Sequence, residues 1–136
     1  MTTLTALAPT SERRVPSSHE DASFHQDPSS PAPPATRPLQ VAFVNNMPDA
    51  AFCTTERQFC RLLQCTGTDI LMRPYVLPSI PRKPVLSNYI QEHYSNLDEL
   101  WDSAPDALIV TGANPHTSML SEERYWRDLC GVLSWG

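Results

Sequence analysis

The sequence has no apolar run approaching the roughly 18 residues that a membrane-spanning helix needs. Its N-terminus also lacks the apolar core of a signal peptide. Nor is the chain basic, because its formal net charge is −5 at pH 7, which gives no electrostatic footprint for nucleic acid. We therefore expect a cytoplasmic protein that binds neither a membrane nor nucleic acid.

Several common catalytic and ligand-binding patterns are also missing. The chain has only 4 glycines, which form neither a Gly-rich phosphate loop nor a G-x-S-x-G elbow. The 4 cysteines form no C-x-x-C pair, and no histidine stands at zinc-finger spacing from them. We expect thiols that serve mainly in packing, with no metal and no bound cofactor. The cysteines are Cys53, Cys60, Cys65 and Cys130.

Proline divides the chain into two regions. Half of the 14 prolines fall within residues 1–38, where large apolar residues are nearly absent. Such a segment cannot bury enough apolar surface to offset the entropy lost on ordering. The composition predicts a disordered leader over residues 1–38 and a folded domain over residues 39–136.

Strand and helix patterns alternate through the second region. Apolar runs rich in β-formers predict strands over residues 39–44, 69–77 and 107–111, and Pro74 favours an edge position for the second strand. Helical spacing predicts a helix over residues 54–65, which a capping box of Thr55 and Gln58 would start. Short helical turns are expected within residues 88–101.

The last predicted helix spans residues 121–134. Ser121 would cap it, and Glu122 and Glu123 would lie in its first turn. Its buried face would consist of the large side chains at helical spacing, which are Trp126, Leu129, Cys130 and Leu133.

This order predicts an α/β fold with a mostly parallel sheet and helices on both faces, of the flavodoxin-like kind. Three strands make a small sheet with an exposed edge. A further buried strand would follow the last helix, so we expect the domain to be incomplete at Gly136.

Ligands bind at the carboxyl ends of strands in open parallel sheets. The loops over residues 45–53 and 112–120 leave two such ends. In the second loop, Gly112 would permit a tight turn that leaves backbone N–H groups able to stabilise an oxyanion. His116 would be a base or a substrate contact there. Spacing alone favours an ordinary strand-ending turn and a surface histidine.

Five short segments, taken in order, resemble the homoserine O-succinyltransferase family. Val41-Ala-Phe-Val-Asn-Asn-Met-Pro-Asp49, followed by Thr55-Glu-Arg-Gln-Phe59, is similar to the family's first strand, loop and helix. Asp106-Ala-Leu-Ile-Val-Thr-Gly-Ala113 resembles its third-strand signature. Tyr125-Trp126 with Leu133-Ser-Trp135 resembles the helix that precedes its nucleophile. The ordered set covers residues 39–136.

The resemblance implies a class I glutamine-amidotransferase-like fold and transfer of a succinyl or acetyl group from acyl-CoA to the hydroxyl of L-homoserine, in methionine biosynthesis. A Cys takes the acyl group as a thioester, a His acts as base and a Glu orients the His. None of the three matches a residue of this chain, and all are expected beyond Gly136. The full-length family would form homodimers.

What carries over is the oxyanion-side loop of Gly112, Ala113 and Asn114, with His116 as a candidate contact on the acyl or substrate side. The Asn114-Pro115 pair and the Asp49-Ala50 pair depart from the commoner family pattern. Donor and acceptor therefore stay open. We expect the chain to be inactive alone, and the alternative is a non-catalytic, amidotransferase-like interaction module.

Overall fold

The computed structural model describes residues 13–15 and 37–135. Its sheet has the strand order β1-β3-β2-β4. β2 (Leu39–Val44) pairs in parallel with β3 (Ile70–Tyr75) on one side and with β4 (Ala107–Val110) on the other. The predicted parallel three-stranded core of the sheet is confirmed, and β2 matches its predicted bounds.

β1 (Arg13–Val15) is an addition that the sequence did not predict. It pairs antiparallel with β3, with Arg13 opposite Met72 and Val15 opposite Ile70. The proposed disordered leader is therefore wrong for these three residues, because ladder bonds to an open sheet edge can hold a short strand whatever its apolar content. Apart from these three residues and residues 37–38, the proposed leader lies outside the described residues.

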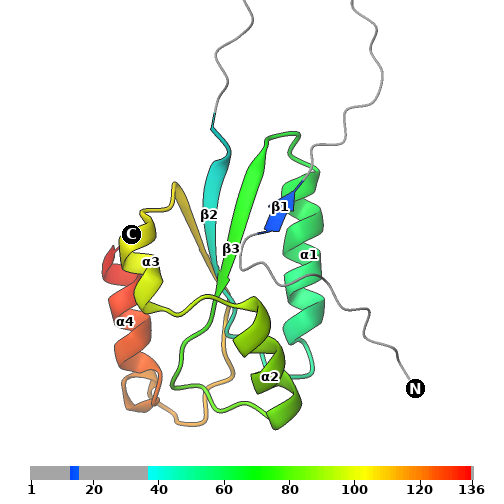
Figure 1. Ribbon diagram of the computed structural model, residues 1–136. Coiled ribbons are helices and arrows are strands. Elements are labelled where there is room, and N and C mark those ends of the chain that lie inside the picture. Colours follow the sequence, from blue (N-terminus) through cyan, green and yellow to red (C-terminus); the bar gives the residue numbers. More distant parts are fainter. Residues whose placement is uncertain (1–12, 16–36, 136) are drawn as a thin grey trace, which may run out of the picture.

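Helices cover both faces of the sheet (Figure 1). α1 (Phe52–Gln64) lies against one face, and α3 (Asp98–Ser103) and α4 (Trp126–Trp135) lie against the other. α2 (Pro84–His93) stands at the lower end of the view. This arrangement confirms the α/β class.

The alternation of side chains along β2 explains the two cores. Ala42 and Val44 point into a cluster with Leu100 and Val132, which α3 and α4 contribute. On the other face, the ring of Phe43 lies 5.1 Å from that of Phe59 on α1. A strand buried on both faces needs a continuous apolar run, which residues 41–44 supply.

The helix boundaries correct several predictions. α1 begins at Phe52 with Ala51 as a cap that makes no side-chain hydrogen bond, so the proposed capping box is wrong. Gly67 adopts φ 70°, which fits the predicted end of that helix. α4 begins at Trp126 after a separate 3₁₀ turn, η1 (Leu120–Glu122), so Ser121 does not cap it.

The buried face of α4 also differs from the prediction. Val132 is fully buried, whereas Leu133 is 59% exposed. The helix begins five residues later than predicted, and its contact with the sheet places Val132 on the inner face. In α3, Leu100 is fully buried, whereas the neighbouring Trp101 is exposed.

Pro74 lies in β3 beyond the residues that pair with β1. Among the described residues, β1 pairs with residues 70–72 of β3 and does not reach Pro74, so its ladder does not need the N–H group that Pro74 lacks. The Pro74 carbonyl oxygen accepts a hydrogen bond of 2.9 Å from the Ser95 N–H. The proline is thus tolerated inside a four-stranded sheet.

Candidate functional site

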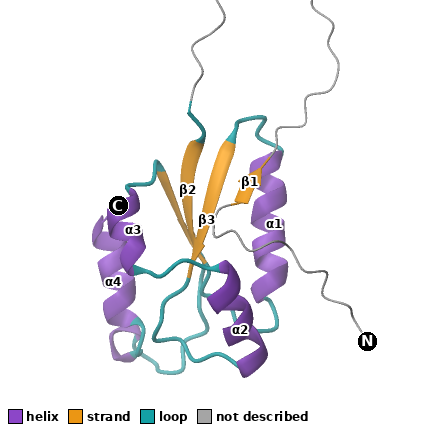
Figure 2. Cartoon of the chain, viewed as in Figure 1, coloured by secondary structure: helices purple, strands orange, loops and turns teal. Residues whose placement is uncertain are grey.

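The two loops singled out in the sequence meet at the carboxyl ends of their strands. The Asn46 N–H, after β2, donates a 2.7 Å hydrogen bond to Thr111 Oγ1, after β4. The Asn46 side-chain amide donates to the Thr111 carbonyl oxygen at 3.4 Å. Figure 2 shows the loops gathered at this lower end of the sheet.

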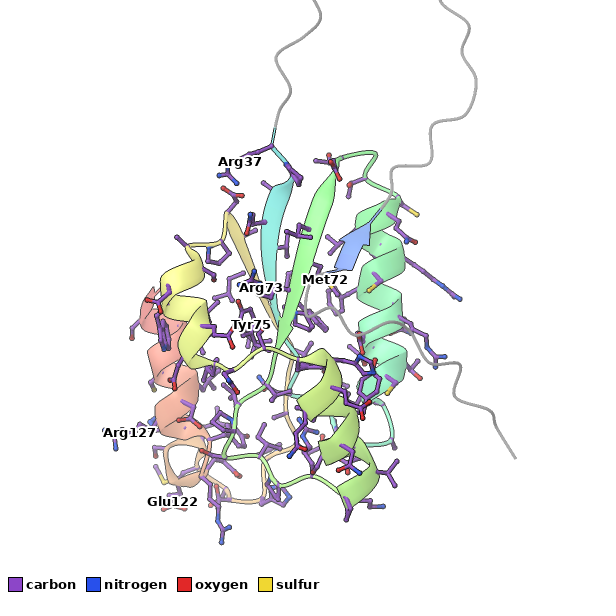
Figure 3. All side chains as sticks on the ribbon, in the orientation of Figure 1. Arg37, Met72, Arg73, Tyr75, Glu122 and Arg127 are labelled. Atoms are coloured by element: carbon purple, nitrogen blue, oxygen red, sulfur yellow. The ribbon has the colours of Figure 1, made fainter. Side chains whose placement is uncertain are left out.

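A cavity of about 730 Å³ opens between these loops. It is lined by the loop after β2 (Asn46, Pro48, Asp49), the loop after β3 (residues 79–83), the loop after β4 (Ala113, Asn114, His116, Thr117), and residues 122–125. Glu122, at its edge, lies at the opposite end of the molecule from Arg37 (Figure 3). The loops that follow all three parallel strands therefore line one cavity, as expected for an open α/β sheet.

The loop after β4 has backbone N–H groups with no acceptor among the described residues. Within the described part of the chain, the N–H groups of Gly112, Ala113 and Asn114 donate no hydrogen bond. Gly112 does not line the cavity, whereas Ala113 and Asn114 do. The expectation that the turn needs a glycine at position 112 is wrong, because the φ of Gly112 is not positive and an added Cβ would meet nothing within 4 Å.

Arg82, in the loop after β3, holds the first loop in place, although nothing in the sequence marks it as part of the site. Its side chain is only 6% exposed. One guanidinium nitrogen donates to the Met47 carbonyl oxygen at 2.5 Å and to Asp49 Oδ1 at 3.3 Å. The guanidinium carbon lies 4.9 Å from the centre of the Phe52 ring. Arg82 lies in the proline-rich stretch 78–84, where no local pattern marks a buried arginine.

Asp49 completes this contact. Its Oδ2 accepts a 2.9 Å hydrogen bond from the Lys83 N–H. Partial desolvation opposes its ionisation, but the Lys83 hydrogen bond and the Arg82 guanidinium outweigh it and hold the pKa of Asp49 below its ordinary value. Asp49 thus joins the loop after β2 to the loop after β3 as a carboxylate.

Glu123 ties down the loop after β4. Its carboxylate accepts hydrogen bonds from the His116 N–H, from the Thr117 N–H at 2.7 Å and from Thr117 Oγ1 at 3.0 Å. The Thr117 N–H, with its neighbours, outweighs desolvation and lowers the pKa of Glu123. The proposed place of Glu123 in the first turn of the last helix is wrong, because η1 ends before it. The sequence pattern suggested a place at a helix N-terminus, whereas Glu123 in fact contacts His116, seven residues earlier in the chain.

His116 lines the cavity. Its side chain is 76% exposed, and its Nδ1 lies 3.7 Å from Glu123 Oε2. The loop, rather than a packed core, therefore presents this imidazole to solvent and to any ligand in the cavity.

The buried hydroxyl of Tyr94 supports the start of the first loop through Asn45. The Tyr94 hydroxyl donates to Glu56 Oε2 at 3.2 Å, and it accepts from the Asn45 side-chain amide at the same distance. Burial and the Glu56 charge both raise the pKa of Tyr94, so the hydroxyl keeps its proton. Glu56 lies in the second turn of α1 and is buried.

None of the cysteines lines the cavity. Cys53 and Cys60 lie on α1, Cys65 follows α1, and Cys130 lies on α4. Among residues 13–15 and 37–135, no cluster of three or more His, Cys, Asp or Glu side chains is arranged to hold a metal ion. None of the helices in these ranges combines the length and apolarity that crossing a membrane requires.

Comparison with known proteins identifies the family to which this chain is similar. The family model described as homoserine O-succinyltransferase matches residues 15–136. A homoserine O-succinyltransferase of Thiothrix nivea is 37% identical over 118 residues, covering 85% of this chain and 31% of that protein. Those of Rhodopseudomonas palustris and Bradyrhizobium japonicum are each 40% identical, covering 74% and 71% of this chain.

The chain thus spans about a third of the length of these relatives. The match extends over β2, β3 and β4 and over every loop that lines the cavity. The resemblance found in the sequence is confirmed: the chain belongs to the homoserine O-succinyltransferase family.

Proposed function

We propose that this chain supplies one side of the acyl-transfer site of a homoserine O-acyltransferase. The complete site moves a succinyl or acetyl group from acyl-CoA to the hydroxyl of L-homoserine, in methionine biosynthesis. Acyl-CoA is a co-substrate, and no resident cofactor is needed. Family membership supports the reaction class, and the cavity at the carboxyl ends of three strands supports the place.

The backbone of the loop after β4 is the observation that carries the proposal. The N–H groups of Gly112, Ala113 and Asn114 donate no hydrogen bond within the described residues, and Ala113 and Asn114 line the cavity. In the transition state of acyl transfer, the carbonyl oxygen of the acyl group gains negative charge. Preorganised N–H groups stabilise that charge, and losing one such donor costs roughly 10²–10³ in kcat.

The covalent chemistry belongs to groups outside this chain. We assign the acyl-accepting Cys, its His base and the Glu that orients the His to sequence outside residues 1–136. The cysteines of the chain lie away from the cavity, which supports this assignment. The thioester forms when the thiolate attacks the acyl-CoA carbonyl and CoA leaves as a thiol, and homoserine then displaces the Cys. His116 contacts the acyl or substrate side.

The test compares the chain with a chimera. In the chimera, residues 15–136 replace the matching segment of the Thiothrix nivea relative. Release of CoA thiol from succinyl-CoA or acetyl-CoA, with homoserine, is followed in both proteins. We expect turnover by the chimera and none by the 136-residue chain.

The controls separate catalysis from folding. Turnover by the chain alone would show that its own residues supply the nucleophile. A folded chimera without turnover on either donor would favour the alternative, a non-catalytic interaction module. Circular dichroism and sedimentation of both proteins establish folding and oligomeric state, including the homodimer that we propose for the complete protein.

A further inference from the structure

The loop after β4 depends on a single carboxylate for its shape. Residues 111–119 form no helix or strand. Yet Glu123 Oε1 gathers three of the loop's donors, which are the His116 N–H, the Thr117 N–H and the Thr117 hydroxyl. The Glu123 side chain is only 4% exposed. A buried carboxylate with three donors holds a loop more firmly than a neutral acceptor would, because charge-assisted hydrogen bonds are about twice as strong.

The second oxygen of the same carboxylate faces the imidazole. Glu123 Oε2 lies 3.7 Å from His116 Nδ1. The two nitrogens of an imidazole point away from one another, so Nε2 is directed away from Glu123. Because His116 lines the cavity and its side chain is largely exposed, Nε2 remains available to a ligand.

We propose that Glu123 is the positioning residue of this site. It fixes the oxyanion-side loop through one oxygen, and it orients His116 through the other so that Nε2 meets the acyl donor in the cavity. The identity of that ligand rests on the proposed function. The positioning of the loop and of the imidazole does not, so the two can fail separately.

The first measurement is amide hydrogen exchange by NMR on the ¹⁵N-labelled 136-residue chain. In Glu123→Ala, we expect the His116 and Thr117 amides to exchange about tenfold faster or more, which corresponds to about 1.4 kcal/mol. Amides of β2 and β3 should be unchanged. Glu122→Gln is the matched control, since Glu122 is an exposed neighbour at the cavity edge, and it should leave all of these rates unaltered.

The second measurement reads the imidazole directly. Proton–nitrogen correlation spectra distinguish the Nδ1–H from the Nε2–H form of a neutral histidine. A carboxylate beside Nδ1 favours the Nδ1–H form. Glu123→Gln keeps the size of the side chain and one acceptor oxygen for the loop, but it places an NH₂ group where Oε2 was. We expect His116 to shift to the Nε2–H form in this variant, a change that mere packing by Glu123 would not produce.

The third measurement adds a ligand. Succinyl-CoA should shift the His116 Nε2 signal of the wild-type chain, and the shift should weaken in Glu123→Gln. If neither succinyl-CoA nor acetyl-CoA shifts the His116 Nε2 signal, the ligand contact is refuted, and the result counts against the proposed function.

The positioning role has its own refutation. Unchanged loop exchange in Glu123→Ala and an unchanged tautomer in Glu123→Gln would overturn it whatever the ligand does. If Glu123→Ala does not fold, the near-isosteric Glu123→Gln still decides the matter through the tautomer.

Discussion

Replacing Arg82 with methionine tests whether the walls of the cavity depend on this buried cation. Arg82→Met keeps the length of the stem but removes the hydrogen bond to the Met47 carbonyl oxygen, the ion pair with Asp49 and the contact with the Phe52 ring. A charge-assisted hydrogen bond contributes about 1.5–3 kcal/mol. The ion pair adds only about 0.5–1 kcal/mol, because the Asp49 side chain is 25% exposed.

The cation–π contact contributes about 0.5–1 kcal/mol. Together these terms predict a loss of about 3 kcal/mol in the free energy of unfolding. Arg82→Lys keeps the charge but loses the planar fork, so we expect roughly half of that loss. Both are large against the 5–15 kcal/mol that is typical of folded domains.

Urea unfolding of the 136-residue chain, followed by circular dichroism, measures these losses as changes in midpoint at constant slope. Arg127→Met on α4 is the control, since Arg127 is exposed and its replacement should change stability by no more than about 0.5 kcal/mol. If Arg82→Met lies within about 1 kcal/mol of the wild type, or Arg82→Lys is fully stable, the guanidinium does not organise the loops as described.

Three further predictions concern the core, the support of the first loop and acid stability. Val132→Ala should cost about 2 kcal/mol by urea unfolding and Leu133→Ala less than about 0.5, and equal losses would contradict the orientation of α4. Tyr94→Phe should cost about 1–3 kcal/mol, because buried partners of its hydroxyl lose a hydrogen bond, and a neutral outcome would refute that role. Asp49 and Glu123 have lowered pKa values, so their contribution is full above the ordinary carboxyl range and is lost as pH falls below about 4. As the pH is lowered toward 3, the free energy of unfolding should therefore fall less steeply in Asp49→Asn than in the wild type. Equal slopes of this free energy against pH would contradict the prediction.

The strands were the most predictable part of the fold. A strand buried on both faces carries an unbroken apolar run, so residues 39–44 were located correctly, and β4 was placed to within one residue of its end. α2 starts at Pro84, and proline in the first turn is a recognised start signal for a helix, although helical turns were expected only from residue 88. β1 has no local signal, since it forms by pairing with the edge of β3, which is distant in the sequence.

The candidate site was only half predictable, for a related reason. The rule that ligands bind at the carboxyl ends of strands located both loops, and family resemblance marked Gly112–Asn114. Arg82 and Glu123 were missed because their roles come from contacts made 35 and 7 residues away in the chain. Charged residues in loops are ordinarily solvated, so burial, which gives these two their importance, cannot be inferred from their neighbours in sequence.

The loop after β4, which we propose lies on the oxyanion side, bears most directly on function. Ala113→Pro in the Thiothrix nivea chimera removes one backbone N–H from the cavity, and the rate of CoA release with homoserine measures the effect. We expect kcat to fall roughly 10²–10³-fold with little change in KM, because the lost donor acts in the transition state. Turnover by Ala113→Pro at the rate of the unmodified chimera would contradict the claim that this loop serves acyl transfer.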